Sequence, residues 1–405
     1  MKDSGIEWIG EVPEEWGIVR LKDCLEINNG KDYKDIETDE TGYPVIGSGG
    51  QFAYARKYLH DGTAILLGRK GTIDKPLYIE GKFWTGDTRF YSVPKSGIYA
   101  KFIYYVALQI PFGLYSTNTA LPRMTQTDLQ NHHFVMPLLD EQTQIADFLD
   151  KKVAQLDKVK SLLEEQIKTL EDYRQSLIYE TITKGLDKTV PLKDSGVDWI
   201  GQIPIASSLK KLKDLLATPL QYGANESGED YDESLPRYIR ITDIDSNGDL
   251  KREGKQSLAE KIATPYILQD GDLLFARSGA TVGKTFLYKS CFGRSAFAGY
   301  LIKASLDKSL VLPEYLYYYT LNPLFNTWKE MTFIQSTIQN IGADRYNILP
   351  VLIYPIEEQQ KMIDYLDCKI SQINQMIAIK KEQTENINKQ RQTLIYDVVT
   401  GKRRI

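Results

Sequence analysis

The chain has 405 residues and a formal net charge of −4, with 50 basic and 54 acidic side chains. This length predicts more than one domain, and the charge total excludes a strongly basic protein, although clustered charge can bind nucleic acid whatever the total. Cys24, Cys291 and Cys368 lie far apart, which argues against a disulfide framework or a zinc site and favours a reducing compartment. The first residues lack the basic and apolar regions of a signal peptide, and no apolar run reaches about 18 residues. We therefore expect a cytoplasmic protein with no metal site and no membrane span.

Residues 1–137 are expected to form a mixed α/β domain. An entry motif, KDSGIEWIGEVP, occupies Lys2–Pro13. After it, short β-rich stretches such as TAILLG and PLYIEG alternate with glycine-containing turns, and KFIYYVALQI favours a helix.

Three polar stretches of this domain carry residue types that contact DNA. Arginine pairs with guanine and asparagine or glutamine with adenine, whereas lysine, hydroxyl groups and backbone N–H groups reach phosphates. The stretches are the GSGG turn, the loop RKGTIDK, and LYSTNTALPRMTQTD just before a long polar segment. The candidates are Ser48, Gly49, Arg69, Lys70, Thr72, Asn118, Thr119 and Arg123. For any single residue, a structural hydrogen bond in a turn explains the pattern as well as DNA contact does.

Residues 138–187 are predicted to form one long helix. Leucines recur every seven residues, and no Pro or Gly interrupts the run before Gly185, which suits a helix C-cap. The seam residues are Leu149, Leu156, Leu163, Leu170 and Leu177. A sustained heptad favours packing against a second helix, and about 40 residues would make a rod of roughly 60 Å. The alternative is an amphipathic helix that lies on its own domain.

The second half of the chain repeats the first. KDSGVDWIGQIP returns the entry motif at Lys193–Pro204, and the helical segments around Glu141 and Glu358 match one another at a constant offset in residue number. We therefore expect a second mixed α/β domain over residues 188–355 and a second long helix over 356–405. The second seam consists of Leu366, Ile373, Ile387 and Leu394, with Lys380 between them. The two helices are expected to pack antiparallel as a coiled coil, with a pseudo-twofold relation between the halves, and to hold the domains apart as a ruler.

RSGATVGKTF, at Arg277–Phe286, ends in the Gly-Lys-Thr of a nucleotide-binding loop. The first glycine that such a loop requires would fall at Ser278, so the motif is incomplete. The equivalent loop of the first half, which starts at Arg69, shares Arg-x-Gly, a Thr and a Lys but lacks Gly-Lys-Thr. The shared residues fit a loop that contacts nucleic acid. The candidates of the second domain are Arg277, Ser278, Thr281, Lys284, Gln335, Ser336, Gln339 and Asn340.

The sequence contains no recognisable catalytic machinery. NPLF at Asn322–Phe325 is close to the Asn-Pro-Pro-Tyr element of amino-methyltransferases, but Leu324 replaces the second proline. No glycine-rich cofactor loop and no Cys/His cluster occurs. These patterns indicate a binding protein and not an enzyme.

In their order, these parts resemble the DNA-specificity subunits of type I restriction-modification systems over nearly the whole chain. The motifs that carry the resemblance are KDSGIEWIGEVPEEW and its copy, YPVIGSGGQFAYA, DLLFARSGATVGK, and the element Pro137/Glu141-Gln142/Ile145/Leu149 with its copy Pro355/Glu358-Gln359/Met362/Leu366. The resemblance implies two target-recognition domains that each read one half of a bipartite, asymmetric DNA site. It also implies a helical spacer that sets the number of unspecified bases between the halves.

The resemblance further implies the partners of the chain. They are double-stranded DNA, two modification (methyltransferase) subunits and, where the system restricts DNA, two restriction subunits. S-adenosylmethionine would belong to the modification subunits, and ATP and Mg to the restriction subunits, so that this chain binds no cofactor. The alternatives are a coiled-coil adaptor that binds only protein and, less favoured, an autonomous nucleotide-dependent enzyme or methyltransferase.

Overall fold

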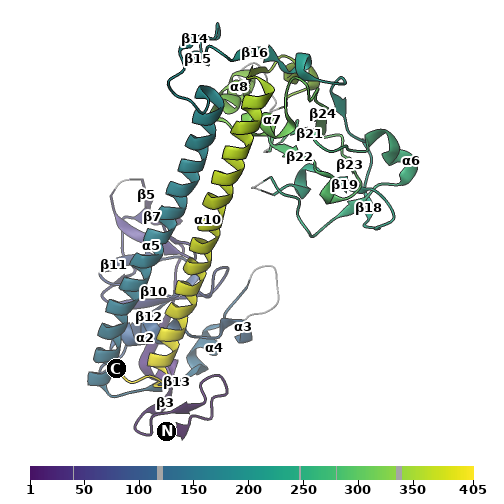
Figure 1. The fold of residues 1–405 in the computed structure, drawn as a ribbon. Helices are drawn as coiled ribbons and strands as arrows, with labels where there is room; N and C mark the ends of the chain where they lie inside the picture. Colours follow the sequence, from purple (N-terminus) through teal and green to yellow (C-terminus); the bar gives the residue numbers. More distant parts are fainter. Residues whose placement is uncertain (40, 116–121, 246–247, 280, 334–339) are drawn as a thin grey trace. The chain divides into compact units, whose positions relative to one another are not determined.

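The computed structural model describes residues 1–39, 41–115, 122–245, 248–279, 281–333 and 340–405 (Figure 1). The candidates Asn118, Thr119, Gln335, Ser336 and Gln339 lie outside the described residues. The chain divides into two compact units: unit 1 is Met1–Glu165 with Lys380–Ile405, and unit 2 is Gln166–Ile379. Each unit therefore combines one globular head with parts of both long helices, whereas the sequence suggested four successive segments.

The head of unit 1 is built around an antiparallel sheet of order β10-β9-β12-β4. Its strands are β10 (Leu77–Ile79), β9 (Ala64–Gly68), β12 (Arg89–Pro94) and β4 (Leu25–Asn29). The central strand β9 is apolar throughout because both of its faces are buried. Ile65 and Leu67 join the core under helix α2 (Ala100–Ala107), and Ala64 and Leu66 join a second core beneath the neighbouring sheet.

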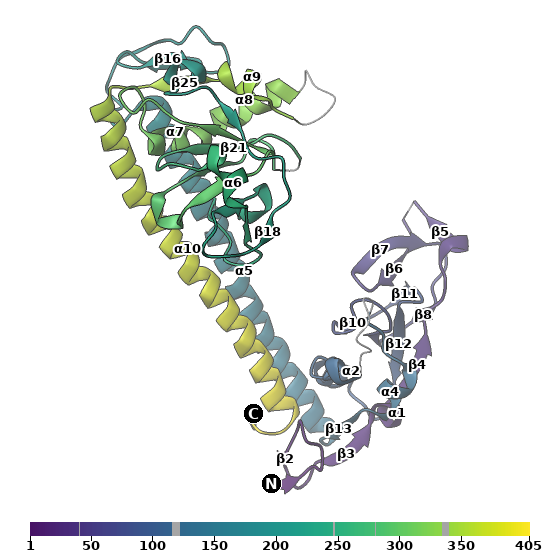
Figure 2. The ribbon, with the colours of Figure 1, turned by 90° about the vertical axis from the view of Figure 1, so that its right-hand side faces the viewer.

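That neighbouring sheet has the order β5-β7-β6-β11-β8 and can be followed in Figure 2. Its strands are β5 (Glu37–Thr38), β7 (Gly50–Ala55), β6 (Tyr43–Gly47), β11 (Lys82–Thr85) and β8 (His60–Asp61). Only β6 and β11 pair in parallel. Two small antiparallel pairs complete the strands of unit 1: β1 (Lys2–Asp3) with β2 (Glu11–Val12), and β3 (Gly17–Arg20) with β13 (His133–Met136).

Unit 2 repeats this topology, except that its second sheet has no strand in the place of β8. Its antiparallel sheet has the order β22-β21-β24-β17, formed by β22 (Thr285–Leu287), β21 (Leu273–Ala276), β24 (Leu301–Ala304) and β17 (Gln221–Tyr222). Its second sheet, β18-β20-β19-β23, again has one parallel pair, β19 with β23. These strands are β18 (Glu229–Asp230), β20 (Gln256–Ser257), β19 (Arg237–Ile239) and β23 (Ser295–Phe297). The mixed α/β architecture expected from the sequence is confirmed.

The remaining elements are short, and several of them have a counterpart in the other unit. In unit 2, β14 (Leu192–Asp194) pairs with β15 (Gln202–Pro204), β16 (Ser208–Lys211) pairs with β25 (Pro350–Ile353), and the expected helix is α7 (Pro313–Thr320). The other α-helices are α1 (Leu21–Cys24), α3 (Phe112–Tyr115), α4 (Gln126–Asn131), α6 (Glu260–Ala263), α8 (Pro323–Phe333) and α9 (Ala343–Asn347). The 3-10 turns are η1 (Lys34–Ile36), η2 (Leu212–Leu215), η3 (Ile241–Asp243), η4 (Thr264–Tyr266) and η5 (Ser290–Phe292).

The long helices α5 (Leu139–Lys184) and α10 (Ile356–Val399) pack on one another in both units. In unit 1, Asp157 Oδ1 lies 3.2 Å from Arg391 Nε, and in unit 2, Arg174 Nη1 donates to Asn374 Oδ1 at 2.8 Å. Asn374 and Arg391 are the repeat equivalents of Asp157 and Arg174, so one contact between the helices occurs twice. The partner residue on α10 decreases in number as that on α5 increases, so the helices are antiparallel, as expected.

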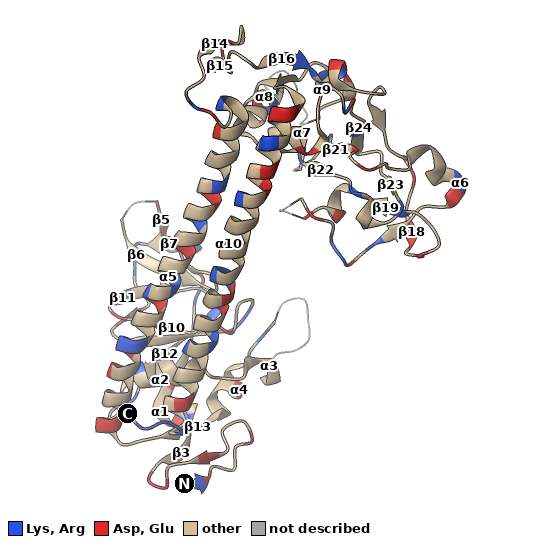
Figure 3. Ribbon diagram, in the orientation of Figure 1, with Lys and Arg blue, Asp and Glu red and all other residues tan. Residues whose placement is uncertain are grey.

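The predicted seam accounts for this packing. Its residues Leu149, Leu156, Leu163, Leu170, Leu177, Leu366, Ile373, Ile387 and Leu394 are all buried or half-buried, and Lys380 is half-buried among them. Gly185 and Gly401 follow the helix ends with φ of 74° and 73°, the left-handed geometry of a C-cap. Figure 3 shows basic and acidic residues interspersed along both helices, which is typical of solvated helix faces.

A buried glutamine joins each head to its long helix. Gln142, in the first turn of α5, accepts a hydrogen bond from the N–H of Tyr99 at 2.9 Å and donates to the carbonyl of Pro137 at 3.0 Å. Gln359, its equivalent in α10, accepts from the N–H of Leu312 at 2.9 Å. Tyr99 and Leu312 are the N-caps of α2 and α7, so the Glu-Gln motif fixes the same helix–helix joint in both units.

Candidate nucleic-acid interface

The loop after β9 of unit 1 brings several predicted DNA-binding residues together. Arg69 donates its N–H to the carbonyl of Thr88 at 2.9 Å, and its own carbonyl accepts from Met124 N–H at 3.0 Å. Lys70 forms an antiparallel bridge with Arg123. The two loops therefore run side by side and enclose a surface hollow of about 420 Å³, which Asn29, Arg69, Lys70, Phe90, Arg123, Met124, Thr125 and Gln126 line.

The hollow of unit 1 is rich in positive charge. Lys70 Nζ pairs with Asp87 Oδ2 at 3.0 Å, and the Arg69 guanidinium donates to the backbone carbonyl of Asp87 at 3.3 Å and lies 5.7 Å from the ring centre of Phe90. Together with Arg123, three cations face a single carboxylate in this group. Such an excess favours an anionic ligand. Thr72, the fourth candidate, is half-buried in the same loop.

Unit 2 has the same backbone arrangement after β21. Arg277 N–H donates to the carbonyl of Tyr300 at 3.0 Å, and Ile341 N–H donates to the carbonyl of Arg277 at 2.8 Å. Ser278 forms an antiparallel bridge with Asn340. Arg277 thus occupies the place of Arg69, and Asn340 that of Arg123; the second pair has the same offset in residue number as the long helices. We call these paired loops the platforms: Arg69 and Lys70 beside Arg123 in unit 1, and Arg277 and Ser278 beside Asn340 in unit 2. The two platforms have the same backbone arrangement and present different side chains.

The Arg277 side chain is held by an aromatic ring. Its guanidinium carbon lies 4.8 Å from the ring centre of Tyr222, and the Tyr222 hydroxyl accepts from Ala343 N–H at 2.9 Å. Arg277 Nε is buried and has no hydrogen-bond partner among the described residues. Tyr300, whose carbonyl accepts from Arg277 N–H, is 61% exposed. Sequence reasoning missed both tyrosines because the chain has 26 of them, and nothing local marks these two.

The GSGG turn of unit 1 is organised by a buried arginine that sequence reasoning also missed. Arg89 is 1% exposed, and its guanidinium donates to the carbonyls of Gly47 at 2.6 Å, Ser48 at 2.9 Å and Lys75 at 3.0 Å. Burial lowers the pKa of Arg89. The predicted phosphate-contacting residues Ser48 and Gly49 lie on this turn, and Gly49 is exposed.

The Gly-Lys-Thr of unit 2 turns inward. The Lys284 ammonium donates to the carbonyls of Ile244, at 3.2 Å, and Asp245, and burial lowers the pKa of Lys284. Thr285 Oγ1 lies 2.7 Å from Thr320 Oγ1. Both side chains therefore make contacts within unit 2. Thr281 lines a hollow together with Gly283, Lys284 and Thr285.

The Asn-Pro-Leu-Phe segment has a structural role as well. Asn322 is fully buried, and its Oδ1 accepts from the N–H of Leu324 at 2.9 Å. Because α8 begins at Pro323, this bond caps the helix N-terminus.

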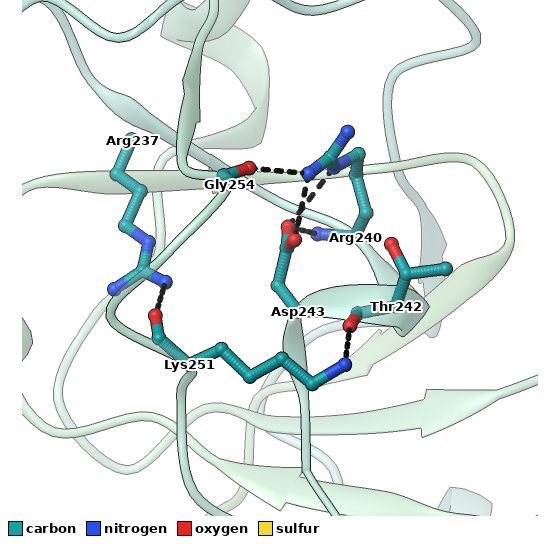
Figure 4. Close-up of polar contacts among 6 residues, drawn as sticks. All are labelled: Arg237, Arg240, Thr242, Asp243, Lys251 and Gly254. Carbon is teal, nitrogen blue, oxygen red and sulfur yellow. Dashed lines mark hydrogen bonds and ion pairs between the residues drawn. The ribbon is translucent and has the colours of Figure 1, made fainter. Parts of the chain in front are cut away.

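A second group of cations surrounds η3 of unit 2 (Figure 4). Arg240 pairs with both carboxylate oxygens of Asp243, at 2.7 and 3.0 Å. Arg237 Nη2 donates to the carbonyl of Lys251, and Lys251 Nζ to the carbonyl of Thr242, both at 2.7 Å. Carbonyl contacts position cations without neutralising them, so one carboxylate balances three positive charges within this group. The i, i+3 spacing of Arg237 and Arg240 was the available sequence signal.

Within the described ranges, no group of three or more His, Cys, Asp or Glu side chains could hold a metal ion. No helix in the same ranges is long and apolar enough to cross a bilayer.

Comparison with known proteins agrees with this architecture. Residues 13–171 match the family model of the type I restriction modification DNA specificity domain. The type I restriction enzyme MjaVIII specificity subunit of Methanocaldococcus jannaschii is 22% identical over 97% of this chain and 94% of its own length. The EcoBI specificity subunit of Escherichia coli is 21% identical over 95% of this chain and 87% of its own.

Two solved structures share the fold. A chain from work on complex assembly and conformational transition of the type I R-M system superposes with a TM-score of 0.71 at 14% identity, covering 96% of this chain and 98% of that one. The HsdS subunit of Thermoanaerobacter tengcongensis superposes with a TM-score of 0.51 at 15% identity, over 100% of both chains.

A duplicated mixed α/β head that packs with parts of two long helices is the fold that this chain shares with these structures. Residues 13–171 match the type I restriction modification DNA specificity domain, and over nearly its whole length the chain is similar to specificity subunits of type I restriction enzymes.

Proposed function

We propose that the chain reads a bipartite, asymmetric DNA site, one half with each unit. The observation that carries this proposal is the duplicated platform, formed by Arg69 and Arg123 in unit 1 and by Arg277 and Asn340 in unit 2. The two platforms have the same backbone arrangement but different side chains. Arginine selects guanine and asparagine selects adenine in the major groove. Arg123 and Asn340, at equivalent positions, therefore favour different bases.

The remaining cations supply affinity. Lys70, Arg237, Arg240 and Lys251 contact phosphates, and such contacts are independent of sequence and sensitive to salt. The chain is acidic overall, with a net charge of −4. We therefore infer that the isolated chain binds DNA weakly and that partner subunits complete the basic surface. Fluorescence anisotropy with the isolated chain checks this, because full site-specific affinity without partners would contradict it.

The chain docks two copies of one modification subunit. Supporting this, the exposed pair Val159 and Leu162 on α5 recurs at the equivalent positions of α10 as the exposed pair Met376 and Ile379. Exposed apolar residues at i, i+3 spacing suit a partner helix. Two equal patches suit two equal partners. In this proposal, the modification subunits bind S-adenosylmethionine and the restriction subunits bind ATP and Mg, so the chain itself binds no cofactor. The assembly works in the cytoplasm.

Mapping methylated adenines tests the proposed reading. In a host that carries the chain and its methyltransferase, Arg123→Ala should relax one half of the methylated site and Asn340→Ala the other. Each loss of a bidentate base contact is worth about 1–3 kcal/mol of discrimination. Lys57→Ala, an exposed lysine outside both platforms, is the control. The proposal fails if either substitution leaves both half-sites unchanged while the complex still methylates DNA.

The paired helices set the number of bases between the half-sites. Their repeated contact, Asp157–Arg391 and Arg174–Asn374, fixes one helix register in each unit. Removing one heptad from both helices should therefore change the gap and keep the half-site sequences. An unchanged gap would show that the helices do not determine it.

A further inference from the structure

A hollow of about 420 Å³ in unit 2 lies between the end of α5 and the first turn of α10. Gly185, Pro204, Ala206, Tyr354 and Glu358 are among the residues that line it. Gly185, Pro204, Ala206 and Tyr354 give it apolar surface, and the charged residues Lys184, Asp187, Glu357, Glu358 and Lys361 line it as well. We call it the Gly185 hollow.

In unit 1, a tryptophan occupies the equivalent place. Trp16 is buried, and its ring Nε1–H donates to Glu141 Oε2 at 3.0 Å. A Cβ added to Gly401 would lie 3.2 Å from the Trp16 ring and 2.4 Å from Pro13. The glycine after the helix, the proline of the entry motif and the glutamate of the Glu-Gln motif therefore surround the indole.

The same three residues recur in unit 2 without the tryptophan. Alignment of the entry motifs places Ser207 where unit 1 has Trp16, and Ser207 Oγ turns back to the carbonyl of Pro204 at 2.7 Å. Tyr354 fills part of the space, but its hydroxyl donates to the carbonyl of Ile182 at 3.2 Å. Glu358 therefore lacks the ring N–H donor of its counterpart and contacts only the exposed Lys361, at 3.4 Å, among the contacts of the described chain.

The entry segment beside the hollow has also lost its two acidic residues. Unit 1 carries Glu14 and Glu15 before its tryptophan, and Glu15 pairs with Arg404 at 2.6 Å. Unit 2 carries Ile205 and Ala206 at these positions, and Ile205 is 58% exposed. An exposed apolar rim beside a hollow marks a protein-binding surface.

We propose that the Gly185 hollow receives a tryptophan side chain of a partner protein, whose ring N–H donates to Glu358. Tryptophan suits a site that combines apolar walls with a carboxylate acceptor, and it is a frequent anchor of interfaces. A second copy of this chain cannot supply the side chain, because Trp8, Trp16, Trp84, Trp199 and Trp328 are all buried or half-buried. Since unit 1 fills the equivalent space itself, this anchor exists once per chain.

Titration with N-acetyl-tryptophan amide, followed by methyl resonances of the full chain, tests the proposal. Val190, Leu192 and Ile205 report from the hollow and its rim. The tryptophan amide should shift these methyl groups and bind at least about tenfold more tightly than N-acetyl-leucine amide, a difference of about 1.4 kcal/mol. N-acetyl-phenylalanine amide, which lacks the ring N–H, should fall between them.

Two variants locate the binding. The double substitution Ile205→Glu and Ala206→Glu places the two glutamates of unit 1 at the rim of the hollow. It should weaken the binding of the tryptophan amide about tenfold. Glu358→Leu should abolish the preference for tryptophan over phenylalanine. Equal affinity for all three amides, or affinity that both variants leave unchanged, would overturn the proposal. So would concentration-dependent shifts of the same methyl groups without any amide, because the rim would then bind a second copy. None of these outcomes depends on DNA reading.

Discussion

Replacing Gln359 by methionine removes the hydrogen bonds that join α10 to the head of unit 2. Gln359 is fully buried, with Oε1 2.9 Å from Leu312 N and Nε2 2.8 Å and 3.1 Å from the carbonyl oxygens of Tyr354 and Leu310. Methionine has a similar length and fits an irregular core, but it can make none of these bonds. The substitution therefore leaves one N–H and two carbonyls without their side-chain partner.

Gln142 provides a matched case with two such bonds instead of three. At about 1 kcal/mol for each hydrogen bond lost, Gln359→Met should lower the free energy of unfolding by about 3 kcal/mol and Gln142→Met by about 2 kcal/mol. The loss should be local, because each glutamine contacts only its own unit.

Urea unfolding followed by circular dichroism measures the two losses, and hydrogen exchange of peptides from α2 and α7 assigns them to a unit. Gln359→Met should accelerate exchange in α7 and spare α2, and Gln142→Met should do the reverse. Losses below about 0.5 kcal/mol for both variants, within the usual range of a surface substitution, would refute the structural role of the motif. Equal acceleration in both helices would refute its local action.

Three other perturbations have defined outcomes. Arg89→Met removes the hydrogen bonds to the carbonyls of Gly47, Ser48 and Lys75, so chemical denaturation should show that the free energy of unfolding of unit 1 falls by about 3 kcal/mol. The control Leu301→Met, at the equivalent position of unit 2, should lower it by less than about 1.5 kcal/mol. Burial lowers the pKa of His132 from 6.5 to about 4, so the unfolded chain takes up the proton first. The free energy of unfolding is therefore highest above pH 6.5 and falls as the pH drops toward 4, by about 2 kcal/mol between pH 7 and 5. His132→Leu should remove this contribution to the dependence of Tm on pH. Arg391→Met breaks a partly exposed ion pair with Asp157 and should cost about 0.5 kcal/mol, so that a loss above about 2 kcal/mol would show a larger role in helix pairing.

Features that depend on local pattern could be predicted from the amino-acid sequence alone. A seven-residue period of leucines can bury one face of a long helix only against another apolar surface, so the seams of α5 and α10 were readable without coordinates. Repeated motifs fixed the correspondence between the halves, including Arg69 with Arg277. The missing first glycine of the Gly-Lys-Thr loop is also readable from the sequence, because Ser278 stands in its place.

Which polar side chains face outward became clear only from the packed fold. Lys284 and Arg277 lie in one loop, yet the first donates to carbonyls inside the head and the second rests on Tyr222, which belongs to a distant segment of the chain. Arg89 reads locally as a surface arginine and proves to be buried against the GSGG turn. Such contacts join residues far apart in sequence, and no local pattern specifies them, because the partner of a polar group is chosen by packing around it. The allocation of part of each long helix to each unit has the same origin, since side chains from distant segments share one core.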